Sequence, residues 1–509
     1  MKLASLTEGL EYKIVSGSET VDVTSIIYDS RKVTEGSLFV CICGFVSDGH
    51  RFISQALEKG AAAIIIQDDQ TVITLPDLAL RAASSNTAVL SLSNTRRALA
   101  HISAAFFSHP SEKIRLIGIT GTKGKTTTTY MLRDIFEKTG KSTGLIGTVS
   151  NIVAGEVRQA DRTTPESYDL QSLLNEMVQK KLDSCIMEVS SQGLMLDRSY
   201  GCRFKVGAFT NLYHDHIGEH EHANMKEYLE AKLLLFDQSE IGVINADSDE
   251  ADKVIAYARP RCPVYTYGID NPCDVRAVRL RKDRQNGKIG TAFVLESPWY
   301  NGSVFVAMPG KFNVYNALCA IAAAGVCGIP FAAVLDALSN VSVPGRLQTV
   351  PGKGDYTVLV DYAHNAASLE NLLCTLREYC SGRLITLFGC GGDRAKSRRY
   401  EMGEISGKLS DLTVITSDNP RTEDPADIIA DILQGFSKAG GKYIIETDRK
   451  KAIALALSLA QENDFVIIAG KGHENYQIFE DRTIHFDDAE TAAEMLSVID
   501  HDREMKENR

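Results

Sequence analysis

The segment Leu116–Leu132, LIGITGTKGKTTTTYML, carries the strongest structural signal in this sequence. Its first residues are apolar and β-branched, as in a buried strand, and a helical pattern begins at Lys125. Gly121 and Gly124 lie between the two and allow the backbone to curl, so that successive N–H groups point toward phosphate oxygen atoms. A strand, a glycine-rich turn and a helix in this order predict a phosphate-binding loop in an α/β domain.

The side chains that follow the turn fit the same chemistry. Lys125 would place a positive charge beside the β- and γ-phosphates of a nucleoside triphosphate, and Thr126 would offer a hydroxyl to Mg²⁺. The N-terminus of the helix adds its dipole. Five residues rather than four separate Gly118 from Gly124, which departs slightly from the usual spacing. A plain glycine-rich turn is the alternative, and the register of the lysine and the threonines argues against it.

Length and composition limit the other interpretations. With 509 residues the chain exceeds what one hydrophobic core normally serves, so we expect two to four domains. A net charge of −11 argues against nucleic acid or an anionic membrane as the main partner. The 11 cysteines form no CxxC pair and fit reduced thiols, and no apolar run is long enough to span a membrane. We therefore expect a cytoplasmic protein.

Patterns of strand, turn and helix alternate along most of the chain and predict three α/β domains. We expect a small N-terminal α/β domain at 1–95, a central P-loop domain with a parallel sheet at 96–342, and a C-terminal Rossmann-like domain at 343–509. Residues 273–308 are expected to form an antiparallel insertion. The expected strands are 38–42, 61–66, 88–92, 115–120, 143–149, 184–189, 207–211, 242–245, 274–281, 291–296, 357–360, 384–388, 412–416, 443–445 and 465–469.

Two strands of the central domain end in polar residues. Glu188 ends the first of them, where an acid would hold a metal ion, although an isolated acid there is more often a cap or an ion-pair partner. The second leads into TNLYHDHIGEHEH, Thr210–His222, with four histidines. This spacing allows a zinc site. No cysteine cluster accompanies the histidines, and a loop at a phosphate site fits as well.

Three loops of the C-terminal domain combine glycines with charged residues. They read GGDR at 391–394, SDNPR at 417–421 and GKGHE at 470–474. Each follows an expected parallel strand, and the carboxyl ends of such strands are where open α/β sheets bind ligands. For an isolated DNPR motif a solvated turn is the simpler interpretation. The two neighbouring loops favour a shared ligand pocket instead, with Pro420 and Pro425 stiffening the DNPR loop.

Together these motifs resemble the Mur ligase family, the ATP-dependent amide-bond ligases of peptidoglycan precursor synthesis, and within it the members that add the third residue of the stem peptide. The resemblance runs nearly from end to end. It rests on YDSRKVTEGSLFV, GTKGKTTT, TTPES, MEVSSQGL, NLYHDH, YLEAKLLLF, GKFNVYNA, PGR, VDYAH, GGDR, DNPRTEDP and AGKGHE. It implies domains that bind, in order, a UDP-sugar, ATP and an amino acid, in a monomer that serves cell-wall biogenesis.

The resemblance also implies the reaction and the site residues. ATP would phosphorylate UDP-N-acetylmuramoyl-L-alanyl-D-glutamate, and meso-2,6-diaminopimelate would attack the acyl phosphate. ATP is expected at Gly121, Thr122, Lys123, Gly124, Lys125, Thr126, Thr127, Asn313, Arg346 and Asp361. Catalysis is expected from Lys125, Glu188, His216 and Lys232, and Mg²⁺ binding from Thr126, Glu188, His216 and Lys232. The UDP-substrate is expected at Ser30, Phe45, Val46, Ser47, Thr163, Thr164, Ser190 and Arg198, and the amino acid at Arg394, Asp418, Asn419, Pro420, Arg421, Gly470 and Glu474.

Lys232 is the residue on which sequence and resemblance differ. In the apolar helix expected at 228–236, a lysine is ordinarily a surface residue whose aliphatic stem lies along the helix. In the Mur ligase family the matching lysine is carbamylated and becomes a carboxylate-like ligand for Mg²⁺. The resemblance therefore implies a carbamate at Lys232 that the residues alone do not predict.

The choice of amino acid rests on a second carboxylate, which meso-diaminopimelate has and L-lysine lacks. Arg421 can bind that carboxylate through two parallel hydrogen bonds, and Arg394 can hold another. Glu474 and the Gly470 carbonyl can receive the ammonium group. L-Lysine would leave a buried Arg421 unpaired, at a cost of roughly 2–5 kcal/mol. We expect selection of meso-diaminopimelate, with L-lysine or another UDP-substrate as the alternatives.

Four positions depart from the family pattern: Gly218 in DHIG, Leu347 in PGRLQ, Asn365 in YAHNA, and Leu196 two residues before Arg198. They suggest a divergent member. A folylpolyglutamate synthetase is a second hypothesis, but it would lack the UDP-sugar domain that YDSRKVTEGSLFV predicts. A non-catalytic nucleotide-binding regulatory protein is a third. A P-loop GTPase is disfavoured because no NKxD-like motif follows the loop.

Overall fold

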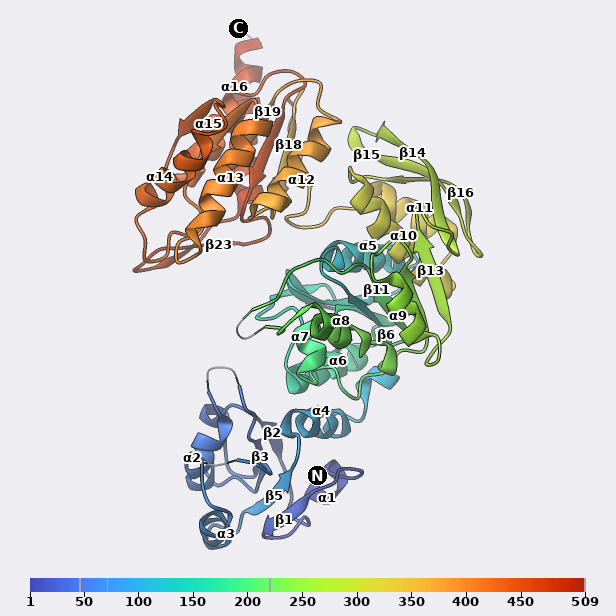
Figure 1. Cartoon of the computed structure of the whole chain (residues 1–509), viewed down its shortest axis with the longest axis vertical. Coiled ribbons are helices and arrows are strands. Elements are labelled where there is room, and N and C mark those ends of the chain that lie inside the picture. Colours follow the sequence, from blue (N-terminus) through green and yellow to red (C-terminus); the bar gives the residue numbers. More distant parts are fainter. Residues whose placement is uncertain (45–46, 71, 219–220, 508–509) are drawn as a thin grey trace. The chain divides into compact units, whose positions relative to one another are not determined.

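The chain folds as alternating strands and helices, which confirms the predicted α/β class (Figure 1). The structure is a computed structural model that describes residues 1–44, 47–70, 72–218 and 221–507. Packing divides the chain into two units, which we describe separately. The first holds Met1–Arg276, Glu296–Tyr300 and Leu318–Val334, and the second holds Ala277–Leu295, Asn301–Ala317 and Leu335–Arg509.

The N-terminal part of the first unit is a sheet with strand order β1-β5-β4-β3-β2. Its strands are β1 (Lys13–Ser16), β2 (Ser25–Ile27), β3 (Ser37–Val40), β4 (Ala63–Gln67) and β5 (Ala88–Leu92). Only β1 runs antiparallel to its neighbour. Helix α1 (Leu3–Leu6) precedes β1, whereas α2 (Ile53–Glu58) and α3 (Leu75–Ser84) lie between strands in sequence. A fourth, α4 (Thr95–Phe106), follows β5, and its Leu99 and Ile102 join the core of this sheet. The exact domain limits stay predictions.

The central part of the first unit is a sheet with strand order β13-β12-β11-β6-β10-β7-β8-β9. Its strands are β6 (Arg115–Thr120), β7 (Thr143–Ile146), β8 (Ser150–Val153), β9 (Glu156–Gln159), β10 (Ser184–Glu188), β11 (Val206–Phe209), β12 (Gly242–Asn245) and β13 (Val264–Gly268). The strands from β13 to β7 are parallel, and the hairpin β8–β9 adds an antiparallel edge that the sequence did not predict. Because β6 lies between β10 and β11, the loop after β6 opens at the middle of the sheet.

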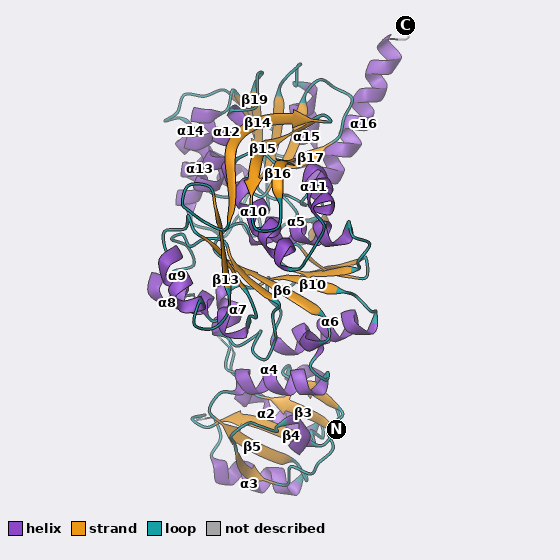
Figure 2. Ribbon diagram, turned by 90° about the vertical axis from the view of Figure 1, so that its right-hand side faces the viewer, coloured by secondary structure: helices purple, strands orange, loops and turns teal. Residues whose placement is uncertain are grey.

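Helices cover both faces of this sheet (Figure 2). They are α5 (Lys125–Glu137), α6 (Ser167–Gln179), α7 (Ser191–Met195), α8 (Met225–Leu233) and α9 (Ala251–Ala258). Strands β10 and β11 are buried along their whole length, as expected for parallel strands between two helical layers.

The predicted antiparallel insertion is confirmed. It consists of β14 (Val275–Gln285), β15 (Lys288–Glu296) and β16 (Asn301–Val306) in the order β16-β15-β14, and β16 was not predicted. Asn286 and Gly287, which have φ values of +49° and +77°, form the turn between β14 and β15. Helices α10 (Lys311–Val326) and α11 (Phe331–Asn340) follow.

The C-terminal sheet of the second unit has the strand order β17-β18-β22-β19-β20-β21. Its strands are β17 (Gln348–Val350), β18 (Thr357–Asp361), β19 (Leu384–Phe388), β20 (Leu412–Ile415), β21 (Tyr443–Ile445) and β22 (Phe465–Ala469). Only β17 is antiparallel to its neighbour, so the loops after β19, β20 and β22 leave the same edge. The helices are α12 (Ala366–Arg377), α13 (Lys396–Leu409), α14 (Pro425–Phe436), α15 (Arg449–Ser458) and α16 (Asp488–Glu507), and a hairpin of β23 (Tyr476–Ile478) and β24 (Thr483–His485) precedes α16.

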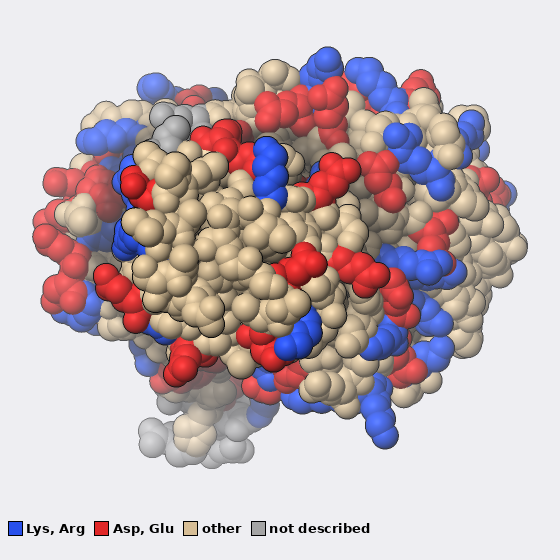
Figure 3. Space-filling model, turned by 90° about the horizontal axis from the view of Figure 1, so that it is seen from below, with Lys and Arg blue, Asp and Glu red and all other residues tan. Residues whose placement is uncertain are grey.

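On the face drawn in Figure 3, acidic and basic side chains are interspersed around a broad area without charged side chains. Within the described ranges, no helix combines the length and the apolar character that crossing a membrane requires.

Candidate functional site

The turn between β6 and α5 has the backbone that a phosphate-binding loop requires. Gly121 has a φ of +148° and Gly124 a φ of +88°. A Cβ at Gly121 would lie 1.9 Å from Thr210 Oγ1, so only glycine fits at that position. The Lys125 ammonium donates to the carbonyl oxygen atoms of Gly121 (2.8 Å) and Thr122 (3.2 Å), which holds it over the loop. Helix α5 begins at Lys125, directly after this turn, so its N-terminus adjoins the loop.

Three other residues predicted for ATP binding are fixed by local contacts. The Thr122 hydroxyl lies 3.0 Å from the Tyr228 hydroxyl. Lys123 pairs with Asp215 at 2.8 Å, and its backbone N–H donates to Asn211 Oδ1. Thr127 is buried in the first turn of α5. These contacts give the loop a defined shape.

Glu188 meets Thr126 beside this loop, as the sequence suggested. Its Oε1 accepts hydrogen bonds from Thr126 Oγ1 (2.9 Å) and from the Thr148 N–H (2.8 Å), and its Oε2 accepts from the Thr148 hydroxyl (3.1 Å). Glu188 is almost fully buried. A buried carboxylate and a threonine hydroxyl are the hard oxygen ligands that Mg²⁺ prefers, so these residues fit such an ion.

Lys232 is 1% exposed, and the surface position that the residues alone predicted is wrong. Its Nζ lies 4.2 Å from the centroid of the Tyr228 ring, and no carboxylate among the described residues pairs with it. Burial and then the neighbouring Lys125 lower the pKa of Lys232 well below its usual value, against a smaller opposite effect of Asp215. The neutral amine, which is the form that reacts with carbon dioxide, is thereby favoured.

The histidines of the loop 210–222 do not gather into a zinc site in the part of the chain that the structure describes. His216 is exposed, and its Nδ1 lies 3.0 Å from Glu221 Oε1. His222 is buried, and its Nε2 lies 2.9 Å from Ser191 Oγ. The Tyr228 ring lies within 5.8 Å of His216 and 4.9 Å of His222, measured between ring centroids. His220 lies outside the described residues.

One group with metal-type ligands occurs among the described residues, formed by Cys43, Asp48 and His50. His50 Nε2 accepts a hydrogen bond from the Gln67 N–H at 2.9 Å, so Nδ1 carries the proton and donates to Asp48 Oδ1 at 2.6 Å. Burial and the neighbouring Asp48 raise the pKa of the Cys43 thiol. Zinc binds cysteine as a thiolate and histidine through a ring-nitrogen lone pair, whereas here the thiol form of Cys43 is favoured and both ring nitrogen atoms of His50 are in hydrogen bonds. We assign it a structural role.

Three residues predicted for the UDP-substrate meet near the carboxyl end of β10. Thr164 Oγ1 donates to the Glu188 carbonyl oxygen and accepts from the Ser190 N–H, both at 3.0 Å. Arg198 Nη1 donates to the Thr164 carbonyl oxygen at 3.3 Å. Nearby, the Thr163 hydroxyl lies 2.9 Å from that of Thr148.

A local excess of positive charge surrounds this cluster. Arg198 pairs with the buried Glu166 at 2.9 Å, and the same carboxylate contacts Arg96 at 3.4 Å and Arg162 at 3.5 Å. Arg198 Nε is buried without a partner in the described part of the chain. Three guanidinium groups around one carboxylate suit an anionic ligand.

The residues predicted for the uridine end are less completely described. Ser30 is buried and begins a short 3₁₀ turn after β2, and Ser47 is exposed in the loop after β3. Phe45 and Val46 lie outside the described residues. Their role in UDP binding stays a prediction.

Asn313, Arg346 and Asp361, predicted for ATP binding, lie in the second unit. The Asn313 amide donates to the Pro309 carbonyl oxygen at 2.9 Å, and the Arg346 guanidinium lies 4.5 Å from the centroid of the Tyr362 ring. Asp361 accepts from the backbone N–H groups of Leu347 (2.8 Å) and Ala363 (2.9 Å), and burial raises its pKa. ATP binding by these residues stays a prediction.

The three glycine-containing loops of the second unit line one cavity of about 180 Å³, as expected from the shared edge of their strands. Two carboxylates, Asp418 and Glu474, line it together with three guanidinium groups, those of Arg394, Arg398 and Arg421. Asn419 and Gly470 also reach the cavity, whereas Pro420 does not line it. Sequence reasoning missed Arg398, which lies in the first turn of α13, directly after the GGDR loop.

Arg421 is held in a conformation that few residues other than glycine adopt, with a φ of +53°. It is half-buried, and its Nη1 donates to the Gly392 carbonyl oxygen at 2.7 Å. A Cβ at Gly391 would lie 2.8 Å from the same Nη1, which explains the glycine. The DNPR and GGDR loops therefore fix each other.

A buried arginine behind the cavity strengthens this link. Arg399 pairs with Glu423 at 2.6 Å and with Asp431 at 2.9 Å. Glu423 Oε1 also accepts from the Asp393 N–H at 2.5 Å. The Arg399 guanidinium, with this N–H, lowers the pKa of Glu423 to about 2.

Two of the departures from the family pattern have local structural roles. Asn365 caps α12 by accepting a hydrogen bond from the Ser368 N–H at 2.9 Å. Leu347 has a φ of +45°, and its N–H binds Asp361. Gly218 donates its N–H to the His222 carbonyl oxygen, and Leu196 ends α7.

In a comparison with known proteins, three models of one protein family match consecutive parts of the chain. The Mur ligase family, catalytic domain, matches residues 22–107, the Mur ligase middle domain matches 119–324, and the Mur ligase, glutamate ligase domain matches 345–472. The chain is 42% identical over 502 residues to the UDP-N-acetylmuramoyl-L-alanyl-D-glutamate–2,6-diaminopimelate ligase of Clostridium botulinum, covering 98% of this chain and 100% of that protein. Identity to the corresponding ligase 1 of Clostridium acetobutylicum is 44%, with the same coverage. A solved structure of a UDP-N-acetylmuramoyl-L-alanyl-D-glutamate–2,6-diaminopimelate ligase has a TM-score of 0.70 at 28% identity and covers 98% of this chain and 99% of its own.

Proposed function

The chain belongs to the Mur ligase family, and we propose that within it the protein is an ATP-dependent ligase joining meso-2,6-diaminopimelate to UDP-N-acetylmuramoyl-L-alanyl-D-glutamate. The observation that supports the choice of amino acid is the cavity of the second unit, which combines three guanidinium groups with two carboxylates. meso-Diaminopimelate carries two carboxylates and two amino groups, so its charges complement this lining. The reaction belongs in the cytoplasm and serves cell-wall synthesis.

In the first step, the γ-phosphoryl group of ATP is transferred to the D-glutamate side-chain carboxylate, giving an acyl phosphate and ADP. Catalysis of such a transfer consists mainly of positioning and of stabilising negative charge. Lys125 and the N–H groups of the loop at Gly121–Gly124 supply both for the phosphates. The arginine-rich cluster around Glu166 binds the anionic UDP-substrate.

The first unit also has residues that fit a divalent cation. Thr126 and Glu188 would hold Mg²⁺, with His216 and a carbamate formed on Lys232 as further ligands. The burial of Lys232 and its lowered pKa support the carbamate, because carbamylation requires a neutral amine. Mg²⁺, when bound, neutralises negative charge on the transferred phosphoryl group.

In the second step, the amino group of the amino acid attacks the acyl carbon. A carbon–nitrogen bond forms, the bond from that carbon to the phosphate oxygen breaks, and phosphate leaves while the amine loses a proton. Glu474 and the Gly470 carbonyl orient the distal ammonium, and Arg421, Arg394 and Arg398 orient the carboxylates. L-Lysine would leave one of these guanidinium groups without its carboxylate.

Identification of the product tests this proposal directly. Purified protein is incubated with ATP, Mg²⁺, the UDP-dipeptide and meso-diaminopimelate, and the nucleotide products are analysed by mass spectrometry. We expect a UDP-tripeptide that forms only when all substrates are present. The variant Lys125→Ala should form none, since it lacks the cation beside the phosphates. Failure of the wild-type protein to form the tripeptide would refute the proposal.

A further inference from the structure

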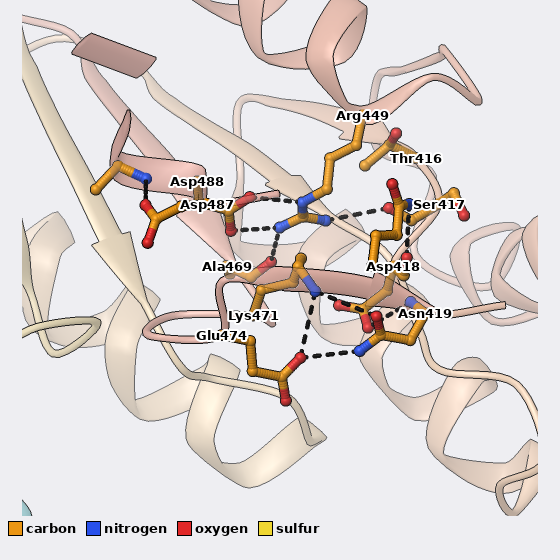
Figure 4. A network of polar contacts seen from close by, with 12 residues as sticks. Thr416, Ser417, Asp418, Asn419, Arg449, Ala469, Lys471, Glu474, Asp487 and Asp488 are labelled. Atoms are coloured by element: carbon orange, nitrogen blue, oxygen red, sulfur yellow. Dashed lines mark hydrogen bonds and ion pairs between the residues drawn. The ribbon is translucent and has the colours of Figure 1, made fainter. Parts of the chain in front are cut away.

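A buried lysine, Lys471, contacts two residues that line the amino-acid cavity, Asn419 and Glu474, but does not line it itself (Figure 4). It is the second residue of the GKGHE loop, and its side chain is 0% exposed. Its Nζ donates to Asn419 Oδ1 (3.2 Å), to Glu474 Oε2 (3.3 Å) and to the Tyr476 carbonyl oxygen. An ammonium group has three N–H donors, so these three acceptors use all of them. Lys471 therefore has no donor left for a ligand.

The contacts of Lys471 converge on one oxygen atom of Glu474. Asn419 Nδ2 donates to the same Oε2 at 2.8 Å, while Asn419 Oδ1 accepts from Lys471 and from the Ile478 N–H at 3.0 Å. No described residue donates to Glu474 Oε1, and Glu474 lines the cavity. One carboxylate oxygen is thus bound by the protein, and the other is free to receive a ligand.

We propose that Lys471 is a positioning residue for Glu474, because it fixes the carboxylate so that one oxygen atom receives the ammonium group of the incoming amino acid. The proposal rests on the proposed function of the cavity. Hydrogen bonds between charged groups are about twice as strong as neutral ones. Lys471 therefore sets the orientation of Glu474.

A second buried cation in the same network offers a comparison. Arg449 forms two hydrogen bonds of 2.7 Å with Asp488 and donates to the carbonyl oxygen atoms of Ser417 (3.3 Å) and Ala469 (3.1 Å) (Figure 4). These carbonyl groups precede the DNPR and GKGHE loops. Arg449 thus holds the backbone of the loops and touches no charged group that lines the cavity. Its loss should affect stability in the first place, whereas the loss of Lys471 should affect the use of the amino acid.

The test is a double-mutant cycle on the full chain, with Lys471→Met, Glu474→Gln and the double variant. Methionine keeps much of the length of lysine and removes its charge and donors. KM and kcat are measured for meso-diaminopimelate at saturating ATP and UDP-dipeptide, and then for the other two substrates. We expect Lys471→Met to raise KM for meso-diaminopimelate by roughly ten- to hundredfold, the range for losing a charged hydrogen bond. The KM values for ATP and the UDP-dipeptide should change less than about threefold.

The cycle separates a positioning role from a structural one. If Lys471 acts through Glu474, its replacement in the Glu474→Gln background adds little, so the two effects are not additive. Additive effects, an unchanged KM for meso-diaminopimelate, or equal increases for all three substrates would overturn the inference. Lys471→Gln, which can still donate one hydrogen bond, replaces the methionine variant if that variant does not fold.

Wild-type turnover with no change in Lys471→Met would defeat only this inference. A wild-type protein with no turnover would defeat the proposed function, and the inference with it.

Discussion

Replacing Arg421 by lysine should weaken the selection of meso-diaminopimelate over L-lysine. The change keeps the positive charge and removes the planar fork that binds a carboxylate through two parallel hydrogen bonds. In the structure one end of the fork, Nη1, is bound to the Gly392 carbonyl oxygen, and no described residue accepts from the other N–H groups. Those groups are the ones that a ligand carboxylate would use.

The size of the effect follows from the burial of Arg421. Breaking a buried charged pair costs about 2–5 kcal/mol, and because Arg421 is only half-buried we take the lower part, about 2–3 kcal/mol. This corresponds to a fall of roughly 30- to 150-fold in kcat/KM for meso-diaminopimelate. Turnover of L-lysine, which has no second carboxylate, should change less than about threefold.

Continuous phosphate release at saturating ATP and UDP-dipeptide measures both amino acids. Arg377→Lys is the matched control. Arg377 is exposed and pairs with Asp411, which directly precedes β20 and so lies at the opposite edge of the sheet from the cavity. A carboxylate-binding role for Arg421 is refuted if Arg421→Lys leaves kcat/KM for meso-diaminopimelate unchanged, or lowers it equally for both amino acids.

Three further predictions concern other parts of the chain. Removing carbon dioxide from the buffer should lower the turnover of the wild type, and adding bicarbonate should restore it. Lys232→Met should be inactive with and without bicarbonate. Wild-type turnover that does not depend on carbon dioxide would contradict the carbamate. The pKa of Glu423 is lowered from its ordinary 4.5 to about 2 by its pairing with Arg399. This pairing therefore stabilises the fold fully above pH 4.5, and the stabilisation is lost as the pH falls toward 2. In Glu423→Gln, stability should depend less on pH between 4.5 and 2 than in the wild type, as acid unfolding followed by circular dichroism would measure. The same acid-unfolding curve for both proteins would argue against this role of Glu423. Arg449→Met leaves the buried Asp488 without its ion-pair partner and should lower the free energy of unfolding of the second unit by about 3–5 kcal/mol. Urea denaturation measures this change, and an unchanged urea concentration at the midpoint of unfolding would be inconsistent with it.

The parallel strands could be predicted because their sequences are nearly continuous apolar runs bounded by turn residues. Strands such as β10 and β22 are buried throughout and carry this signal along their whole length. The hairpin β8–β9 was missed because β9, EVRQ, is polar and mostly exposed and has no apolar alternation. The burial of Lys232 was also beyond the pattern, since α8 carries its apolar residues on several sides and does not show which face meets the sheet.

The convergence of the three loops on one cavity could be anticipated from their shared position after parallel strands. Which residues of these loops line the cavity and which only support the others could not be predicted. Amino-acid binding by Asn419 stays a prediction. Its amide also contacts Glu474 and Lys471, an arrangement that depends on how the loops after β20 and β22 approach each other across β19. Such contacts arise between residues distant in sequence, and no local pattern encodes them.

Phosphate release by the purified protein with ATP, Mg²⁺ and UDP-N-acetylmuramoyl-L-alanyl-D-glutamate, run against a panel of amino acids, is the sharpest test of the proposed function. We expect rapid release with meso-diaminopimelate and a kcat/KM for L-lysine lower by at least about 30-fold. Equal release with L-lysine, or none with meso-diaminopimelate, would contradict the proposed function.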